Sequence, residues 1–484
     1  MIHYAIDWER VRTSFQKIWG YSDFRPPQGE IVRSLLEGKD ALIVMPTGGG
    51  KSICFQLPAL LQTGLTIVVS PLVALMENQV RELQQRQLSA ASLHSQLEKY
   101  QRKQILSAIE KQDLRLLYLS PETLLSPPVW QRLSQPNIKI NGLILDEAHC
   151  LVQWGETFRP AYRRLGAVRP ALLKNKPPGT KIAIAAFTAT ADPTAQAIVT
   201  NTLQLQQPES FLLSPYRSNL NLQVKVIWTP RGRKQQMLKF IQKRGSQAGL
   251  VYVRSRRDSE ELAMWFARSQ YKTAAYHAGL SPQQRRKIEN DWLDDRTQFV
   301  VCTSAFGMGI NKPNVRWVVH FQAPQLLSEY LQEIGRGGRD GKKADAFTLI
   351  SEPTGWLNPE DKQKERFFAL NLQKQYRKAQ QIAKKIPSIG DIETIKHQFA
   401  NGEIALSLLH SVGQLEWIDP FNYQRNNDRA QKSFSQLNAM QQRSQREMSQ
   451  FLTTNKCRWQ FLLNAFGFTK EATGFKCGHC DRCL

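Results

Sequence analysis

Short apolar segments rich in β-branched residues recur through the first part of the chain. They occur in the sequences ALIVMP, LTIVVSP, LRLLYLSP, GLILDEAH and IAIAAFTAT. Longer stretches with a helical pattern, such as LVALMENQVRELQQRQL, separate them. Strands that are apolar along their whole length and alternate with helices are typical of a parallel sheet covered on both faces. The pattern therefore predicts a first α/β lobe, which we place at residues 1–214.

A second series of the same kind begins near residue 245. Its strand-like segments are AGLVYVRS, TAAYHAG, FVVCTSAF, VRWVVHF and DAFTLI. The same architecture is therefore predicted twice, with a second lobe at residues 215–355 and a join near SPYRSNLNLQ (214–223). The cleft between two such lobes is a natural place for a ligand.

The chain becomes polar from about residue 355, and the strand-like runs stop. We expect residues 356–450 to be mostly helical. Two short helices, DIETIKHQF and EIALSLLHSV, are followed by a candidate hairpin, QLEWIDPFNYQ. This order is that of a winged helix, and a helical spacer without a binding role is the alternative. The polar segment that follows, RNNDRAQKSFSQLNAMQQRSQREMSQF, is either a helix or a flexible linker.

The charge of the chain favours a polyanionic partner. Lys and Arg number 65 against 41 for Asp and Glu, so the formal net charge is +24 and the pI is about 9.8. Such a surplus attracts polyanions, and nucleic acid is the leading interpretation, although charge alone does not distinguish DNA from RNA. A merely basic protein is the alternative.

No targeting or membrane segment is expected. The N-terminus, MIHYAIDWERVRTSF, alternates charged and apolar residues and lacks the pattern of a signal peptide. We find no apolar stretch long enough to span a bilayer. The sequence therefore predicts a cytoplasmic protein with no membrane partner.

The segment MPTGGGKS (45–52) follows one of the predicted strands and precedes a helix. Glycines allow backbone N–H groups to approach phosphate oxygens, and the N-terminus of a helix adds positive potential. Met45 stands where the usual phosphate-loop pattern has Gly, but the strand–loop–helix context supports ATP binding. Lys51 is expected at the β- and γ-phosphates and the Ser52 hydroxyl at Mg²⁺. The predicted nucleotide-binding residues of this loop are Thr47, Gly48, Gly49, Gly50, Lys51 and Ser52.

Charged groups for phosphoryl transfer occur in two further segments. Asp146 and Glu147 end the strand of LILDEAH, where Asp146 would hold Mg²⁺ and Glu147 would activate water. In QEIGRGGRDG, Arg336 and Arg339 lie three residues apart, on one face of a helix if the segment is helical. A guanidinium there would stabilise transition-state charge. Two surface arginines are the alternative.

Four cysteines cluster near the C-terminus in the pattern C-x19-C-x2-C-x2-C. This grouping predicts a tetrahedral structural Zn²⁺ site. Two disulfides are the alternative, which an intracellular location disfavours. The proposed zinc ligands are Cys457, Cys477, Cys480 and Cys483, and the remaining three cysteines are predicted to be buried thiols.

Together these motifs resemble the RecQ family of DNA helicases in helicase superfamily 2. The resemblance runs in family order from residue 20 to 341, through GYSDFRPPQGEIV, MPTGGGKS, VVSPLVALMENQV, YLSPETL, DEAHCLVQWGETFRPAY, AFTATA, YHAGL, FGMGINKPNVRWVVHF and QEIGRGGRDG. It implies two RecA-like lobes with ATP between them. It also implies 3′→5′ unwinding of duplex DNA, translocation on single-stranded DNA, and a role in DNA repair or recombination. The zinc pattern, CR followed by CGHCDRC, is also similar to that of the family.

The resemblance also implies roles for individual residues. Gln28 would read adenine and Arg25 would pack on the base. Arg339 would be the arginine finger, with Arg336 beside it near the γ-phosphate. The residues implied to couple ATP to movement are His149, Thr188 and Thr190. Those implied to contact DNA lie in backbone-binding motifs and are Ser70, His277 and Thr303.

The chain departs from the family pattern in its C-terminal part. A long insertion, about residues 370–450, precedes the zinc module that we place at 451–484, and the chain ends one residue after Cys483. We expect a short form without the domains that usually follow the zinc site. A duplex-binding winged helix before that site is one hypothesis. A translocase that does not separate strands, or an annealing protein that ATP merely switches, are alternatives to a helicase. The expected partners are single-stranded and duplex DNA and single-strand-binding or recombination proteins, and the expected state is a monomer.

The loop after the Asp-Glu-Ala-His box carries two aromatic residues and an arginine, Trp154, Phe158 and Arg159. In RecQ-like proteins such a loop senses single-stranded DNA. Its aromatic rings can stack on bases, and Arg159 can contact phosphate or stack. Because the loop is continuous with Asp146 and Glu147, binding of DNA to it could align the carboxylates. The alternative is a tryptophan buried against the sheet.

Trp154→Ala should leave ATP binding intact and abolish the stimulation of ATP hydrolysis by single-stranded DNA, because one stacking surface worth about 1–3 kcal/mol is removed. ATP binding and hydrolysis with and without DNA are measured. Stimulation that survives the substitution would disprove the role of the loop.

Overall fold

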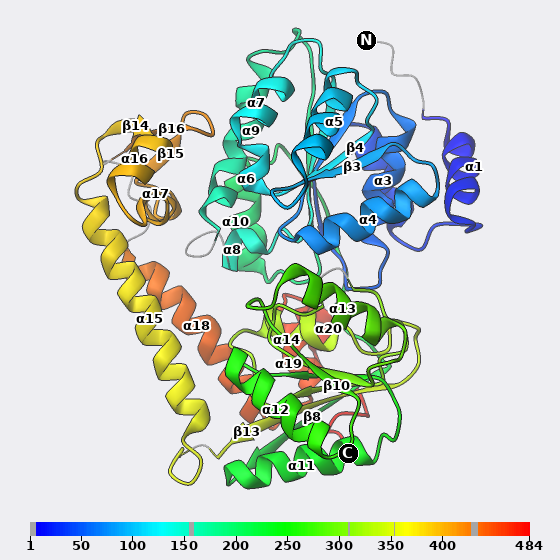
Figure 1. Ribbon diagram of the computed structural model, residues 1–484, viewed down its shortest axis with the longest axis vertical. Coiled ribbons are helices and arrows are strands. Elements are labelled where there is room, and N and C mark those ends of the chain that lie inside the picture. The colour runs from blue at the N-terminus through cyan, green and yellow to red at the C-terminus, as the bar shows by residue number, and fades with distance from the viewer. Residues whose placement is uncertain (1–5, 154–158, 308–309, 353, 427–433) are drawn as a thin grey trace. The chain divides into compact units, whose positions relative to one another are not determined.

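The computed structural model describes residues 6–153, 159–307, 310–352, 354–426 and 434–484 (Figure 1). The chain forms two compact units. Unit 1 comprises Met1–Leu213 and Gln375–Leu437, and unit 2 comprises Ser214–Lys374 and Asn438–Leu484. The chain therefore passes between the units at three points. Among the described helices, none is long and apolar enough to cross a membrane.

Unit 1 contains a seven-stranded sheet, in the order β3-β4-β2-β5-β6-β1-β7, with parallel pairing throughout. Most of its strands are buried along their whole length, because helices cover both faces. The strands are β1 (Ala41–Val44), β2 (Leu65–Val69), β3 (Ala90–Leu93), β4 (Leu116–Leu119), β5 (Ile140–Leu145), β6 (Ala183–Thr188) and β7 (Glu209–Leu212).

Successive residues of each strand enter different cores. In β1, Leu42 and Val44 belong to one apolar cluster, and Ala41 and Ile43 belong to another. The two clusters therefore lie on opposite faces of the sheet. The helical elements of this lobe are α1 (Trp8–Trp19), α2 (Gln28–Leu36), α3 (Lys51–Leu61), α4 (Val73–Gln85), α5 (Lys99–Glu110), α6 (Pro121–Leu124), α7 (Pro127–Leu133), α8 (Cys150–Gln153), the 3₁₀ helix η1 (Pro160–Ala167), α9 (Val168–Leu173) and α10 (Pro193–Leu203).

A buried ion pair lies near the N-terminal ends of β1, β6 and β7 and links them. Asp40 precedes β1, and both of its carboxylate oxygens accept hydrogen bonds at 2.7 Å from the Arg169 guanidinium. The same carboxylate accepts from the backbone N–H groups of Ile184 and Gln206. These hydrogen bonds offset the desolvation cost of burying the pair, whereas removal of one partner would leave an uncompensated buried charge.

Unit 2 contains a six-stranded sheet, in the order β10-β11-β9-β12-β13-β8, again with parallel pairing. Gly249 allows a close approach in this sheet, since a Cβ there would lie 2.1 Å from the Trp317 ring. The strands are β8 (Leu220–Ile227), β9 (Gly249–Tyr252), β10 (Thr273–Tyr276), β11 (Phe299–Cys302), β12 (Trp317–His320) and β13 (Ala344–Ser351). The helices are α11 (Pro230–Gln242), α12 (Arg256–Arg268), α13 (Pro282–Leu293) and α14 (Leu327–Ile334).

The C-terminal region is mostly helical and contains a winged-helix module at residues 387–425. Its three-stranded antiparallel sheet has the order β14-β16-β15 and packs with two helices. Two long helices flank the module in the chain. The elements are α15 (Glu360–Ala383), β14 (Ile389–Asp391), α16 (Ile392–Gln398), α17 (Gly402–Ser411), β15 (Leu415–Trp417), β16 (Asn422–Arg425), α18 (Phe434–Thr453), α19 (Arg458–Ala465) and α20 (Thr469–Ala472).

The predicted architecture of two parallel-sheet lobes and a winged-helix insert is confirmed. Each apolar run singled out in the sequence forms a strand, and the polar segment after the hairpin forms α18 from Phe434 onward, the part that the structure describes. Four strands were not predicted, namely β3, β7, β8 and β14, of which the last three are partly exposed. The four predicted domain ranges stay predictions. The winged-helix module and the adjoining residues, 375–437, form one compact unit with residues 1–213.

Candidate active site and metal centre

The phosphate loop lies between β1 and α3, at the carboxyl edge of the sheet. Gly48 and Gly50 have φ values of 85° and 80°, in the left-handed region that favours glycine. The Lys51 ammonium donates to the Met45 carbonyl at 3.0 Å, within the loop itself. These are the conformations and the cation that the binding of a polyphosphate requires.

Met45 occupies a position where the usual pattern has glycine, and its environment explains why it is tolerated. The side chain is 1% exposed and belongs to the apolar core beneath the sheet. Its backbone N–H donates to the Thr188 carbonyl at 2.9 Å, so the residue continues the pairing of β1 with β6. Glycine is instead required at position 49, where a Cβ would lie 2.7 Å from the Met45 side chain.

The two adjacent carboxylates follow β5 at the same edge. Asp146 extends the pairing with β2, since its N–H donates to the Val69 carbonyl at 2.9 Å. Glu147 has a φ of 53°, a left-handed conformation that is uncommon for any residue with a side chain other than Asn or Asp. Such strain is commonly retained where a side chain must be aimed at a reacting group.

The pKa of Asp146 fits a site for a divalent cation. Burial raises this pKa to about 7, and the Glu147 carboxylate acts in the same direction, while Lys51 opposes it. Two carboxylates that destabilise each other in a buried position are relieved by a divalent cation, and Mg²⁺ prefers such oxygen ligands. Asp146 and the Ser52 hydroxyl, in the first turn of α3, are the residues that would hold it.

A chain of polar contacts joins the carboxylates to the end of β6. His149 Nδ1 lies 3.3 Å from Glu147 Oε2 and 3.2 Å from the Thr188 hydroxyl. That hydroxyl accepts from the Thr190 N–H at 3.2 Å. The three residues implied to couple ATP to movement are therefore brought together with Glu147.

Gln28 is buried and bonded to the phosphate loop, whereas the side chain of Arg25 is exposed. Gln28 is 4% exposed, and its amide donates to the Gly49 carbonyl at 3.0 Å. Its carbonyl accepts from the Arg25 N–H at 3.0 Å, so it fixes the loop before α2. The Arg25 side chain itself is exposed, as expected of a group that would cover a base.

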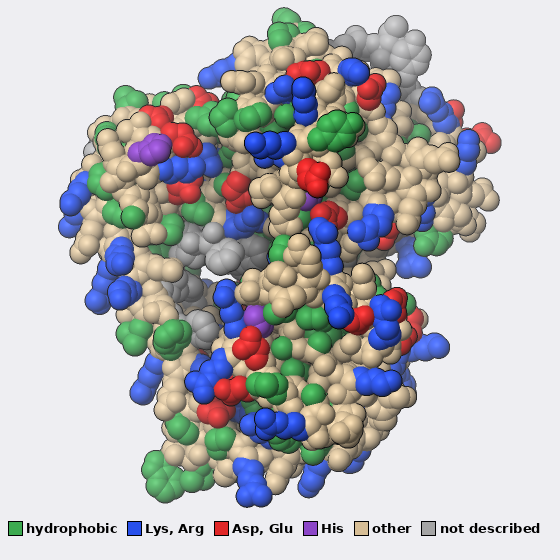
Figure 2. Space-filling model, viewed as in Figure 1, with side chains coloured by type: hydrophobic (Ala, Val, Ile, Leu, Met, Phe, Trp, Pro, Cys, Tyr) green, Lys and Arg blue, Asp and Glu red, His purple; other side chains and the backbone are tan. Residues whose placement is uncertain are grey.

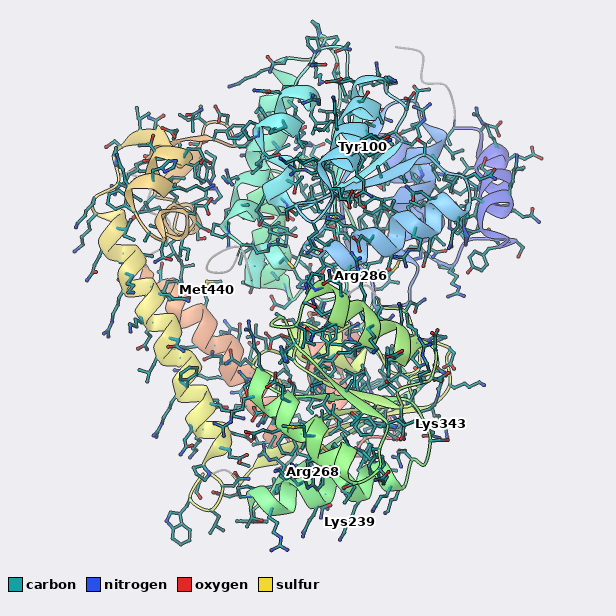
Figure 3. The ribbon with its side chains drawn as sticks, in the orientation of Figure 1. Tyr100, Lys239, Arg268, Arg286, Lys343 and Met440 are labelled. Carbon is teal, nitrogen blue, oxygen red and sulfur yellow. The ribbon has the colours of Figure 1, made fainter. Side chains whose placement is uncertain are left out.

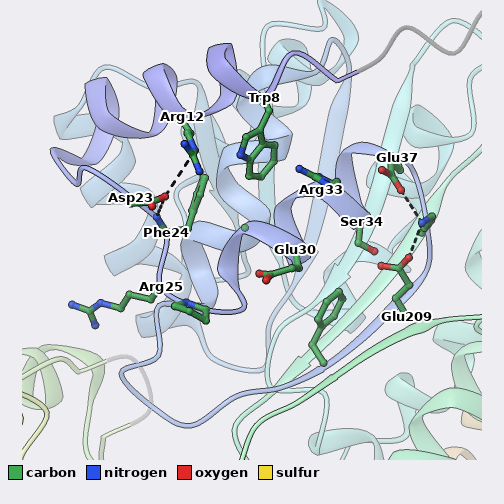
Figure 4. Close-up of a pocket in the computed structure, with 14 residues that line it drawn as sticks. Trp8, Arg12, Asp23, Phe24, Arg25, Glu30, Arg33, Ser34, Glu37 and Glu209 are labelled. Carbon is green, nitrogen blue, oxygen red and sulfur yellow. Dashed lines mark hydrogen bonds and ion pairs between the residues drawn. The ribbon is translucent and has the colours of Figure 1, made fainter.

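A pocket of about 460 Å³ lies beside this loop, between α1, α2 and the edge strand β7 (Figure 4). Trp8, Phe24 and Phe211 line it together with charged residues from α2. Arg25 is the one predicted nucleotide-binding residue among the described residues of its lining. The pocket is therefore not the phosphate site.

The predicted arginines of unit 2 are held by backbone carbonyl groups. The Arg336 guanidinium donates to the Gly307 carbonyl and is 6% exposed. Arg339 donates to the Ile310 carbonyl at 2.9 Å. The condition under which both would lie on one face of a helix is not met, because α14 ends at Ile334 and turns follow. The Gly-rich sequence after α14 explains this ending.

The predicted DNA-contacting residues lie at the carboxyl ends of strands. Ser70 follows β2 and its hydroxyl is buried. In unit 2, Thr303 follows β11, and His277 follows β10 with its Nε2 2.9 Å from Glu260. Arg159 donates to the Pro71 carbonyl and, at 3.2 Å, to Glu122, so it links the SPL and SPE segments. Trp154 and Phe158 lie outside the described residues, and their DNA-stacking role stays a prediction.

Basic side chains are spread over the surface in view (Figure 2). In unit 2, Lys239, Arg268 and Lys343 are exposed and come from different elements (Figure 3). The positive charge is therefore distributed over the surface rather than confined to one motif, and it would attract a polyanion at long range.

The four C-terminal cysteines form a candidate zinc centre. Their sulfur atoms lie within 4.8 Å of one another, with closest S···S distances of 3.6, 3.8 and 3.9 Å. Tetrahedral zinc with Zn–S bonds of about 2.3 Å requires S···S distances of about 3.8 Å. All seven cysteines are free thiols, so the two-disulfide alternative is not realised, and Cys54, Cys150 and Cys302 are buried as predicted. His479 lies beside the cluster, but its Nε2 contacts the Tyr216 hydroxyl at 3.2 Å.

The zinc module packs along β8, the outermost strand of the sheet in unit 2. The Trp459 indole donates to the Leu220 carbonyl at 3.2 Å, and Asp481 N–H donates to the Leu222 carbonyl at 3.0 Å. The Asp481 carboxylate also accepts from the buried Arg458. The sequence did not indicate this contact, because it joins residues more than 230 positions apart.

Cys480→Ser should release zinc and unfold the C-terminal end, because structural zinc contributes about 10–16 kcal/mol in zinc-finger peptides. Metal content and thermal melting of the full chain are measured. Cys54→Ser, in a buried free thiol outside the cluster, is the control and should keep its zinc. A Cys480→Ser protein with unchanged metal content and melting profile would contradict the assignment.

Three family models match this chain. The DEAD/DEAH box helicase model matches residues 25–198, the helicase conserved C-terminal domain matches 232–341, and RecQ zinc-binding matches 390–484. The third match begins well before the cysteines and includes most of the winged-helix module.

Solved structures with the same fold are helicases of low sequence identity. The Mycobacterium smegmatis helicase Lhr bound to ssDNA and AMP-PNP has a TM-score of 0.55 at 21% identity, covering 71% of this chain and 48% of that one. The DEAD-box helicase Mss116 bound to ssRNA and UDP-BeF has a TM-score of 0.58 at 17% identity, covering 72% and 73%. These likenesses show the fold alone.

Curated relatives are similar over much longer stretches. The chain is 50% identical over 480 residues to the ATP-dependent DNA helicase RecQ of Synechocystis sp.. The matched residues cover 99% of this chain and 99% of that relative. It is 38% identical over 344 residues to the ATP-dependent DNA helicase RecQ of Haemophilus influenzae, covering 71% of this chain and 54% of that relative. The phosphate loop, the carboxylate pair and the cysteine cluster all lie within the matched family models. This chain therefore belongs to the RecQ family of helicases.

Proposed function

We propose that this protein is an ATP-dependent DNA helicase that unwinds duplex DNA with 3′→5′ polarity. The observation that carries the proposal is that Lys51, Asp146 and Glu147 lie together at one edge of a parallel sheet. Glu147 is in turn linked through His149 to Thr188 and Thr190. The 50% identity to a relative named as an ATP-dependent DNA helicase supports the choice of DNA.

Each group at this edge has a role in hydrolysis. Lys51 exchanges its contact with the Met45 carbonyl for the β- and γ-phosphates. Ser52 and Asp146 would hold Mg²⁺, which would supply positive charge beside the phosphate oxygens. Glu147, held in its strained conformation, orients the attacking water and accepts its proton.

Coupling to movement follows from the contact between Glu147 and His149. A change at the γ-phosphate that moves Glu147 alters this contact, and Thr188 then transmits it to the segment after β6. In unit 2, Arg339 is the proposed finger and Arg336 its neighbour near the γ-phosphate. Arginine fingers raise the rate of hydrolysis by about 10³–10⁵-fold where their effect has been measured.

DNA is proposed to bind along the carboxyl ends of the strands. Ser70, His277 and Thr303 would contact the sugar–phosphate backbone, and the loop with Trp154, Phe158 and Arg159 would sense the bases. We propose single-stranded and duplex DNA as the substrates and repair or recombination as the setting. Single-strand-binding or recombination proteins are the proposed partners of a cytoplasmic monomer.

A DNA-stimulated translocase that does not separate strands is the second candidate. It is favoured by the placement of the β15–β16 hairpin, whose tip packs against lobe 1 (residues 6–213) of its own unit. A strand-separating wedge would need a hairpin that is free to enter a duplex. An assay of duplex unwinding decides between the two functions.

Duplexes with a 3′ tail should be unwound in the presence of ATP and Mg²⁺, and duplexes with a 5′ tail should not, because family polarity places the motor on the 3′ strand. Lys51→Ala should abolish unwinding while DNA binding persists, because only the phosphate contact is lost. Strand release is followed by gel or fluorescence.

DNA-stimulated ATP hydrolysis without strand release from either substrate would instead establish the translocase. Unwinding of the 5′-tailed duplex alone would contradict the proposed polarity.

A further inference from the structure

The winged-helix module packs against lobe 1 through the two elements that such modules commonly use to bind DNA. Its second helix, α17, packs against η1. The wing, which is the turn at 418–421 between β15 and β16, reaches the helix α7. Because winged and helix-turn-helix modules place their recognition helix in the major groove, this packing has a direct consequence for what the module can bind.

The helix α17 lacks the basic side chains that bind DNA phosphates. Its sequence, GEIALSLLHS, has no Lys or Arg, and every residue from 402 to 411 is buried or half-buried. Recognition helices contact phosphates and base edges through accessible polar and basic side chains. In α17 the apolar positions are instead divided between the core of the module and lobe 1.

Charged groups fix the contact between α17 and η1. The Arg164 side chain is 5% exposed, and its guanidinium lies 3.9 Å from the Glu403 carboxylate, which also pairs with Lys396 at 2.9 Å. The same guanidinium donates to the Pro420 carbonyl in the wing at 3.2 Å. Arg164 therefore contacts both α17 and the wing, while its buried Nε has no partner among the described residues. A buried cation that is only partly compensated makes a contact sensitive to the loss of one partner.

The tip of the wing extends the apolar core of lobe 1. The Phe421 ring meets the Trp130 ring of α7 edge to face, with centroids 5.3 Å apart. Phe421 is also packed against the large core cluster of lobe 1. Edge-to-face pairs contribute about 0.5–1.5 kcal/mol beyond the area they bury.

We propose that α17 and the wing are an intramolecular docking surface for lobe 1, and that the winged-helix module therefore does not read duplex DNA with these elements. The docked module holds η1 in place. It also gives the chain a second attachment to lobe 1, because α15 leads from unit 2 into unit 1 and α18 leads back. The hypothesis of a duplex-binding winged helix before the zinc site is replaced by this one.

The docking has a consequence for the segment that precedes η1. Arg159 is the residue before this element, and its guanidinium holds the Pro71 carbonyl and Glu122. A docked module therefore restrains the residues that join the proposed DNA-sensing loop to the SPL and SPE segments. This inference rests on the contacts alone and stands whether or not the protein unwinds DNA.

Hydrogen exchange in the full-length protein tests the docking. Glu403→Arg places a second cation beside Arg164, so exchange of the backbone amides at 160–167 and 402–411 should rise by about tenfold or more. Phe421→Ala, which removes the wing ring while β16 keeps its backbone pairing, should raise exchange at the same two segments. Unchanged metal content shows that the zinc module is intact.

The matched control is Glu416→Arg. It makes the same charge change in the same module, but Glu416 is exposed on β15 and takes part in no ion pair among the described residues. Its exchange at 160–167 should stay within about twofold of the wild type, since no contact with Arg164 is altered.

Duplex DNA provides the second arm of the test. Adding a forked duplex to the wild-type protein should leave exchange at 402–411 and 418–422 unchanged. Slower exchange of these segments on DNA, together with faster exchange at 160–167, would show that the elements leave lobe 1 to bind the duplex and would overturn the proposal. Unchanged exchange in both Glu403→Arg and Phe421→Ala would overturn it as well.

Discussion

The parallel pairing of buried strands is the constraint on which the rest of the structure depends. Because the strands of a parallel sheet run in one direction, the residues that follow them gather at one edge. In unit 1 the order β5-β6-β1 places the Asp-Glu-Ala-His box, the Thr188–Thr190 segment and the phosphate loop on adjacent strands. The contacts from Glu147 through His149 to Thr188 exist because these strands are neighbours. In unit 2, β10 and β11 likewise bring His277 and Thr303 to one edge.

The C-terminal region is organised by long-range packing rather than by strand order. The zinc module completes the edge of the sheet in unit 2, and the winged-helix module is seated on lobe 1. Both are held by a buried arginine, Arg458 in one and Arg164 in the other, each with a carboxylate partner. Full satisfaction of Arg458 suits a permanent structural role. The buried Nε of Arg164 has no partner among the described residues, so this contact is the more sensitive of the two to the loss of a partner.

The sequence predicts those parts of the fold whose signal is local. Fully apolar runs specified the central strands, and the alternation of helix, turn and hairpin specified the winged helix. The strands β7 and β8 were missed because edge strands are partly exposed and lack such runs. The left-handed Glu147, the ion pair of Asp40 with Arg169 and the docking of Phe421 on Trp130 all depend on residues distant in the chain. No local pattern encodes them. Arg336 and Arg339 lie in turns after α14, because the glycines that follow Ile334 disfavour a helix.

We propose that ATP is hydrolysed at this edge of the sheet, with Glu147 acting on the attacking water. Nucleotide binding and steady-state hydrolysis by Glu147→Gln at saturating single-stranded DNA test this role. Because the amide keeps the shape but cannot accept a proton, ATP affinity should stay within about threefold while hydrolysis falls by about 10²–10⁴-fold. Hydrolysis within about tenfold of the wild type, at normal affinity, would contradict the account, since general-base loss would then cost too little.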